Sequence, residues 1–167
     1  MELIEAIEQW DGKSTDYLVD AFEEHCSREE FASDLVDLAA VPELQTAATW
    51  LLKHHFEQDG SLDSELQKDL FRGLQQLEHW GAKLHVLQIF DRLTIPTAER
   101  KPCEQFLAEC LESENKFVRA WTMHGYHALA TQHSEYQESV TKMLQGALET
   151  EAASVKARVR KLLKAGF

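Results

Sequence analysis

Apolar side chains recur every three to four residues along almost the whole chain, as they do in helices that bury one face. No segment alternates apolar and polar residues with the period of two that a half-buried strand requires. Only seven glycines and three prolines interrupt the pattern, too few for a chain of many tight turns. The pattern predicts an all-α protein with helices over 2–10, 15–26, 28–40, 42–58, 63–78, 80–94, 101–112, 116–131, 135–148 and 152–165.

Several residues mark the expected ends of these helices. Asn115 directly precedes the predicted helix over 116–131, where its side chain can accept hydrogen bonds from the first backbone N–H groups. Ser27 and Glu30 have the spacing of a capping box. Gly60 follows the predicted helix over 42–58, a position that favours glycine.

Four of the predicted helices share one register. They align on Leu44, Ala82, Val118 and Val155, which are separated by 38, 36 and 37 residues. The positions four, seven and eight residues further on are mostly apolar in all four copies and form one helical face. An amphipathic helix precedes each copy, so a pair of helices repeats every ~37 residues, as in α-solenoids.

Two segments within this register resemble a known repeat family. Residues 115–121 read NKFVRAW and resemble the opening of the second helix of a HEAT repeat, and residues 153–158, ASVKAR, repeat it. The resemblance covers about residues 28–165. It implies a right-handed α-solenoid of about four HEAT-like hairpins over 28–167, with residues 1–27 as a short helical N-terminal cap. The whole is expected to form a single compact domain.

The net charge of −12 is unevenly distributed. Residues 1–79 hold 19 acidic and 5 basic side chains, whereas residues 152–167 hold five bases and no acid. Such an acidic body disfavours nucleic acid, because binding to phosphates requires lysine and arginine. The basic end either complements the dipole of the last helix or forms a small patch for an anion or a partner. The absence of an apolar run of 18 residues and the acidic start predict a cytoplasmic protein without a membrane segment.

The chain lacks recognisable catalytic, nucleotide-binding and metal-binding motifs. We therefore expect no cofactor; enzymatic activity is left open, and a non-enzymatic role is favoured. Three cysteines without a CxxC pair are interpreted as small core residues. His124 and His127 lie three residues apart, and stacking of the repeats would bring Asp91 near His127. Because only the two histidines are linked by sequence, we predict no metal site.

Second helices line the concave face of HEAT solenoids, so their outward positions predict the functional surface. The hypothesis is a non-enzymatic protein–protein interaction or scaffold module that binds a protein partner there. The candidate binding residues are Trp50, Lys83, Gln88, Asp91, Arg119, Met123, His124 and His127. For Arg119 an alternative is open, in which it only bridges to acids of the neighbouring repeat.

A second hypothesis uses the same groove for nucleic acid. DNA-glycosylases of the DNA-alkylation-repeat type are also short HEAT-like solenoids with tryptophan, arginine and aspartate on the concave side. This chain has Trp121, Arg119 and Asp91 in its predicted second helices. The acidic body argues against this alternative, and the sequence leaves the oligomeric state open.

Overall fold

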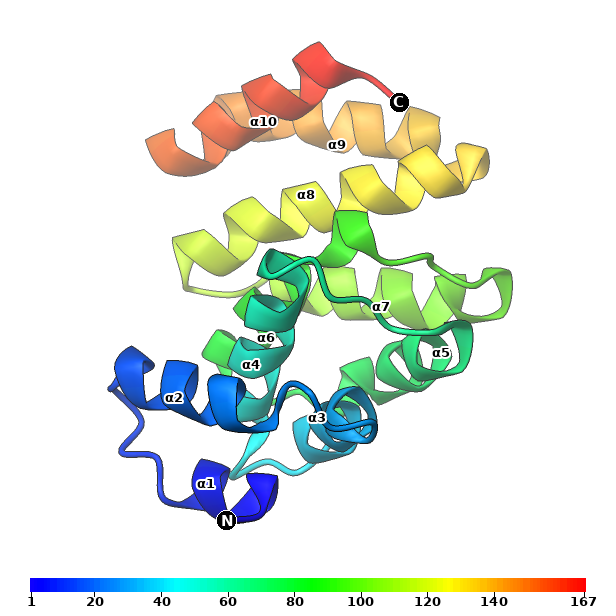
Figure 1. The fold of residues 1–167 in the computed structure, drawn as a ribbon. Coiled ribbons are helices and arrows are strands. Elements are labelled where there is room, and N and C mark those ends of the chain that lie inside the picture. The colour runs from blue at the N-terminus through cyan, green and yellow to red at the C-terminus, as the bar shows by residue number, and fades with distance from the viewer. The chain divides into compact units, whose positions relative to one another are not determined.

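All the regular elements of the chain are helices, which confirms the predicted all-α class (Figure 1). The computed structural model describes residues 1–167 and contains no strand. None of the helices is both long and apolar enough to span a membrane. The α-helices are α1 (Leu3–Glu8), α2 (Thr15–His25), α3 (Phe31–Ala39), α4 (Gln45–Glu57), α5 (Ser64–Gly73), α6 (Trp80–Leu87), α7 (Arg100–Leu111), α8 (Lys116–Gln132), α9 (Gln137–Thr150) and α10 (Ala153–Ala165). Short 3-10 turns are η1 (Leu74–Gln76), η2 (Phe90–Arg92), η3 (Thr97–Glu99) and η4 (Ser134–Tyr136).

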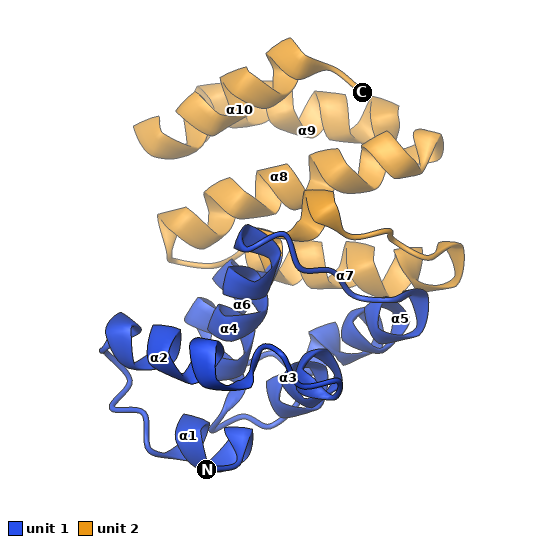
Figure 2. Ribbon diagram, viewed as in Figure 1, with its two compact units in different colours: residues 1–86 blue, residues 87–167 orange.

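The helices form two compact units, residues 1–86 and residues 87–167 (Figure 2). In the first unit, α3 packs against α4 and α5, and α2 packs against α4. The short helix α1 contacts both α2 and α3. Phe31 and Leu35 of α3 and Leu51 and Leu52 of α4 are at most 2% exposed, so the α3–α4 contact is the centre of this unit's core.

In the second unit, α8 packs against α7 on one side and against α10 on the other, and α9 packs against both α8 and α10. The apolar positions of α8, α9 and α10 meet in one cluster that includes Met123, Leu144 and Val159. Helix α8 approaches α7 closely at Gly125, where an added Cβ would lie 2.6 Å from Leu107 Cδ2. A glycine in this otherwise apolar column therefore makes room for the neighbouring helix.

One buried amide fixes the end of the α5–η1 segment to α4. Gln45 is fully buried. Its Oε1 accepts hydrogen bonds from the backbone N–H groups of Glu78 (2.6 Å) and His79 (2.8 Å). Its Nε2 donates to the carbonyl of Gln76 at 3.3 Å. Gln45 thus holds the segment that leads directly into α6.

Arg119 makes the corresponding connection in the second unit. Its Nε lies 3.1 Å and 3.2 Å from the two carboxylate oxygens of Glu151, just before α10, and its Nη2 adds a third contact at 3.2 Å. Nη1 donates to the carbonyls of Ser113 (2.9 Å) and Glu114 (3.1 Å). Gln45 and Arg119 occupy the same position in the predicted register, one residue after Leu44 and Val118.

The predicted helix ends are correct at some positions and wrong at others. Asn115 caps α8, because its Oδ1 accepts from the N–H groups of Phe117 and Val118. The capping box at Ser27 is wrong: residues 26–30 form turns, and α3 begins only at Phe31 without a side-chain cap. The helix predicted over 80–94 ends at Leu87, and η2 follows after a turn.

Gly60 does follow the helix end, but the left-handed conformation falls on the preceding residue. Asp59 has φ of 62°. Gly60 is instead required by space, since an added Cβ would overlap the imidazole ring of His55. The N–H of Gly60 donates to the carbonyl of His55 at 2.8 Å, which closes the end of α4.

Candidate functional site

Four polar and aromatic side chains gather on one side of the second unit. Asp91 comes from η2, Trp121 and His124 come from α8, and Arg158 comes from α10. The guanidinium carbon of Arg158 lies 3.6 Å from the centroid of the Trp121 ring, and the His124 ring meets Trp121 edge-on at 5.2 Å. His124 Nε2 lies 3.4 Å from Asp91 Oδ1. We call these four residues the Trp121–Arg158 cluster.

Arg158 is the cation of this cluster. It stacks on Trp121 but forms no hydrogen bond and no ion pair through its nitrogen atoms. Desolvation lowers the pKa of Arg158, and the negative charge of Asp91 partly opposes that effect. Arginine stays protonated at any physiological pH, so the cluster presents a positive group with free N–H donors in a fixed orientation.

His124 is neutral at neutral pH. Burial lowers its pKa below the ordinary value, while the nearby carboxylate of Asp91 acts in the opposite direction. The Nε2–Oδ1 distance of 3.4 Å is longer than a well-formed charge-assisted hydrogen bond. His124 therefore serves as a half-buried polar wall beside Trp121, with Asp91 at its edge.

The other basic residues of α10 are also unpaired. None of them forms an ion pair. The helix also contains no acidic residue that could repel an anionic partner. Helix α10 as a whole is therefore positive, in contrast to the chain as a whole. These bases are Lys156, Arg160, Lys161 and Lys164.

Two of the predicted binding residues have structural roles in the second unit. Arg119 forms an ion pair with Glu151, and the two side chains are only 22% and 16% exposed. Met123 is 2% exposed and packs in the core between α8, α9 and α10. The prediction that Met123 lies on the binding surface is wrong, because α10 covers the face of α8 from which it projects.

His127 lies further along α8 and contacts the end of the chain. Its Nε2 is 2.6 Å from the carbonyl of Gly166, and its ring stacks on Phe167 at 5.1 Å. The expectation that Asp91 would approach His127 is wrong, since Asp91 lies beside His124, one turn earlier. No group of three or more histidine, cysteine or acidic side chains is arranged to hold a metal ion.

The remaining predicted residues are Trp50 and Lys83 in the first unit and Gln88 in the second. Trp50 stacks on His54 at 5.1 Å, and Lys53 Nζ lies 5.8 Å from its ring centroid. Lys83 and Gln88 are half-buried, and their side chains form no hydrogen bond or ion pair. Trp50 therefore has a local aromatic partner, but no cluster comparable to that around Trp121 surrounds Lys83 or Gln88.

Arg158 is a site residue that was not predicted from the sequence, although a signal was present. Arg158 and Trp121 each lie three residues after the start of their copy, at Val155 and Val118. Because α8 and α10 are adjacent, equivalent positions of the two helices become neighbours. The register thus contains the Trp121–Arg158 pair. From the sequence, Arg158 is predicted only to be part of the basic C-terminal segment.

The cysteines and tyrosine near α7 offer no reactive group. Cys103 is fully buried, and burial raises the pKa of its thiol to about 12. Burial likewise raises the pKa of Tyr126 to about 12. Both side chains are therefore protonated at neutral pH, which leaves no thiolate nucleophile at Cys103.

His85 in the first unit is the most strongly shifted histidine. Its Nδ1 lies 3.1 Å from Thr49 Oγ1. Burial, and to a smaller extent the positive charge of Lys53, lowers its pKa from 6.5 to about 4, while a hydrogen bond with the Thr46 backbone acts in the opposite direction. Below pH 6.5 the unfolded chain therefore binds a proton that the folded chain does not bind until about pH 4.

This difference predicts a loss of stability in acid. The contribution of His85 is fully present above pH 6.5 and is lost as the pH falls, by about 3 kcal/mol at pH 4. Urea denaturation at several pH values, compared between the wild type and His85→Gln, measures this contribution. The variant should show a shallower pH dependence, whereas the exposed-site control His79→Gln should follow the wild type. If the free energy of unfolding changed equally with pH in the wild type and in His85→Gln, the lowered pKa of His85 would be contradicted.

Comparisons with known proteins add no identification. A scan against protein-family models finds no match, and searches of the curated proteins and of the solved structures also find none. The functional inference therefore depends on the side chains and helix packing of the two units.

Proposed function

We propose that this chain is a HEAT-like helical-hairpin protein that acts as a non-enzymatic protein-interaction module. Two observations support the HEAT-like interpretation. Gln45 and Arg119 share one register position, and each ties its helix to the segment preceding the next second helix. Trp121 and Arg158 also share a register position and stack on each other. Such repeated connections between neighbouring helical pairs are expected of stacked repeats.

The binding surface in this proposal is the side of α8 and α10 that carries the Trp121–Arg158 cluster. The observation that carries the proposal is the guanidinium of Arg158, which lies over the Trp121 ring while its N–H donors have no partner. Stacking fixes the orientation of the group, so little side-chain entropy remains to be lost when it binds. Arginine and tryptophan are also the residues most enriched among the energetic centres of protein interfaces.

An acidic segment of a protein partner suits this surface. A carboxylate can accept two parallel hydrogen bonds from a guanidinium, and the unpaired bases of α10 add attraction around it. Long-range steering would bring such a segment to α10 rather than to the first unit, which holds 19 acidic and 6 basic residues and so carries a net charge of −13.

The nucleic-acid alternative has less support. Arg119, which that alternative would use, is bound to Glu151 and to two backbone carbonyls. The Asp91 carboxylate would repel a phosphate placed near Arg158, and the chain as a whole carries a charge of −12. Asp91 also repels the carboxylate of a protein partner. A single carboxylate meets this repulsion once, whereas every phosphate of a nucleic-acid strand is repelled by the acidic chain.

The proposal predicts which substitutions abolish binding. The probe is a phage-displayed library of acidic peptides selected on the immobilised wild type, with a selected peptide then labelled for fluorescence anisotropy. Arg158→Gln and Trp121→Ala should each weaken binding of that peptide by about tenfold or more, because each removes half of the stacked pair. Lys142→Gln removes a charge on α9 away from the cluster and should leave the affinity unchanged.

Melting temperatures of all variants separate lost binding from lost folding. Unchanged affinity in both Arg158→Gln and Trp121→Ala would contradict the proposed surface. Tight binding of a labelled single-stranded or duplex DNA that Arg158→Gln abolishes would instead favour the nucleic-acid alternative.

A further inference from the structure

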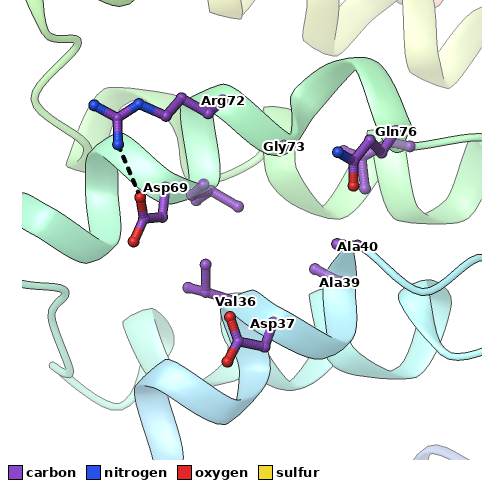
Figure 3. A pocket seen from close by; sticks show the side chains of 10 residues that line it. Val36, Asp37, Ala39, Ala40, Asp69, Arg72, Gly73 and Gln76 are labelled. Atoms are coloured by element: carbon purple, nitrogen blue, oxygen red, sulfur yellow. Dashed lines mark hydrogen bonds and ion pairs between the residues drawn. The ribbon is translucent and has the colours of Figure 1, made fainter.

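The first unit carries a surface hollow that the proposed function does not use. It lies between α3 and the α5–η1 segment (Figure 3) and has a volume of about 230 Å³. Val36, Leu70 and Leu77 supply its apolar lining. Three further lining residues, Ala39, Ala40 and Gly73, are small and leave this space open. A Cβ added at Gly73 would meet no atom within 4 Å.

The size of the hollow indicates the kind of group that fits. Pockets for small-molecule ligands usually enclose about 300–1,000 Å³. A hollow of about 230 Å³ is smaller and suits one aliphatic or aromatic side chain. Such shallow apolar hollows are filled in protein complexes by a single anchoring residue of the partner.

A second hollow lies on the other side of Asp37. It has a volume of about 300 Å³ and is lined by apolar residues of α1 and α3, including Leu3, Ile4 and Leu38. Ile4 is 44% exposed, so it adds accessible apolar surface to this hollow. Asp37 lines both hollows, so one carboxylate separates two apolar depressions along α3.

The rim of these hollows is negative. The carboxylates of Asp34 and Asp37 form no hydrogen bond and no ion pair. The two nearby arginines are already paired, Arg72 with Asp69 at 3.1 Å and Arg28 with Glu2 at 3.1 Å. Figure 3 shows Asp37 on α3 facing the side of the hollow that Asp69 and Arg72 border.

We propose that this face of α3 binds a segment of a partner protein in which an apolar side chain is next to a lysine or arginine. The apolar side chain enters the hollow between α3 and α5, and the basic group approaches Asp37. Charge complementarity identifies this occupant, because the rim offers free carboxylates and the first unit has a net charge of −13. This site is independent of the Trp121–Arg158 cluster and of the function proposed for it.

Gly73 allows a direct test. Its backbone is helical, with φ of −79°, so a leucine there is compatible with the fold and fills the hollow. Gly146 of α9 is the matched control, because an added Cβ there also meets no atom within 4 Å. Asp37→Lys tests the expected attraction between Asp37 and the basic residue of the partner. Asp20→Lys on α2 is its control, because it makes the same change of charge elsewhere on the first unit.

The probe is a phage-displayed library of random peptides, selected on the wild type and counter-selected on Gly73→Leu. Selected peptides should contain an apolar residue adjacent to lysine or arginine. In fluorescence anisotropy, Gly73→Leu and Asp37→Lys should each weaken their binding by about tenfold or more, while Gly146→Leu, Asp20→Lys and Arg158→Gln should not change it.

Three outcomes would overturn the proposal. The first is a selection that yields no peptide, or only peptides without the basic residue. The second is unchanged affinity in Gly73→Leu and Asp37→Lys variants whose melting temperatures match the wild type. The third is self-association of the wild type, measured by analytical ultracentrifugation and abolished by Gly73→Leu, which would assign the face to a second copy of the chain. Whether acidic peptides bind at Arg158 does not affect this test, because the α3 site and the Trp121–Arg158 cluster are probed with different peptides.

Discussion

Replacing Gln45 by leucine is expected to lower the free energy of unfolding by about 3 to 5 kcal/mol. Leucine has nearly the same volume, so the change creates no large cavity. It removes the only side-chain partners of the N–H groups of Glu78 and His79 and the donor to the carbonyl of Gln76. A backbone group left without a hydrogen bond beside the fully buried side chain of residue 45 costs about 1–3 kcal/mol. The three groups belong to exposed residues, so the expected total lies toward the lower end of the summed range.

Urea denaturation followed by circular dichroism measures this effect. Gln145→Leu on α9 is the matched control, because Gln145 is exposed and its side chain has no hydrogen-bond partner. The control should change the stability by less than about 0.5 kcal/mol. If Gln45→Leu were equally mild, water would have to replace the glutamine, and the segment before α6 would not depend on this side chain.

The sequence predicted the helical content because that depends on local periodicity. The ten predicted ranges each overlap one observed α-helix, since amphipathic spacing and helix-favouring residues act within a few turns. Asn115 was a reliable signal for the same reason: its capping hydrogen bonds reach only residues two and three positions away. Local chemistry of this kind needs no knowledge of the partner helix.

Ends that depend on distant contacts were not predictable. Ser27 and Glu30 have the right spacing for a cap, yet residue 28 is held by its ion pair with Glu2, 26 positions earlier. Residues 26–30 form turns in the structure. The sequence gives no indication that α1 returns to this segment.

The candidate site was predictable only in part, for a geometric reason. The register identified Asp91 and His124 as outward positions, and the structure joins them. It also placed Met123 outward, although the adjacent helix covers that side of α8. Positions one residue apart differ by about 100° around a helix, so the boundary between core and surface depends on how the neighbouring helices pack.

The hollow along α3 had no sequence signal at all. Glycine and alanine at Ala39, Ala40 and Gly73 are unremarkable in a helical chain. They produce a hollow only because α3 and the α5–η1 segment lie next to each other, which brings Gly73 near alanines more than thirty residues earlier in the sequence. Interaction surfaces formed from small residues on separate helices therefore require the structure.

Replacing Arg119 by methionine is expected to lower the free energy of unfolding by about 3 kcal/mol. Methionine retains the apolar stem but leaves the Glu151 carboxylate, which is 16% exposed, without its counter-charge. The carbonyls of Ser113 and Glu114 also lose their donor. The cost is larger than for a surface ion pair because both partners are partly shielded from water.

A double-mutant cycle with Glu151→Gln isolates the direct interaction. The two single variants should each be destabilised, and the double variant should lose less than their sum, with a coupling energy of about 1 to 2 kcal/mol. The matched control is Lys142→Met on α9, whose ion pair with Glu138 has side chains 71% and 83% exposed and should contribute little. Additive effects of Arg119→Met and Glu151→Gln would show that the bridge does not connect α8 to the start of α10. That result would also remove one of the two repeated connections on which the HEAT-like interpretation depends.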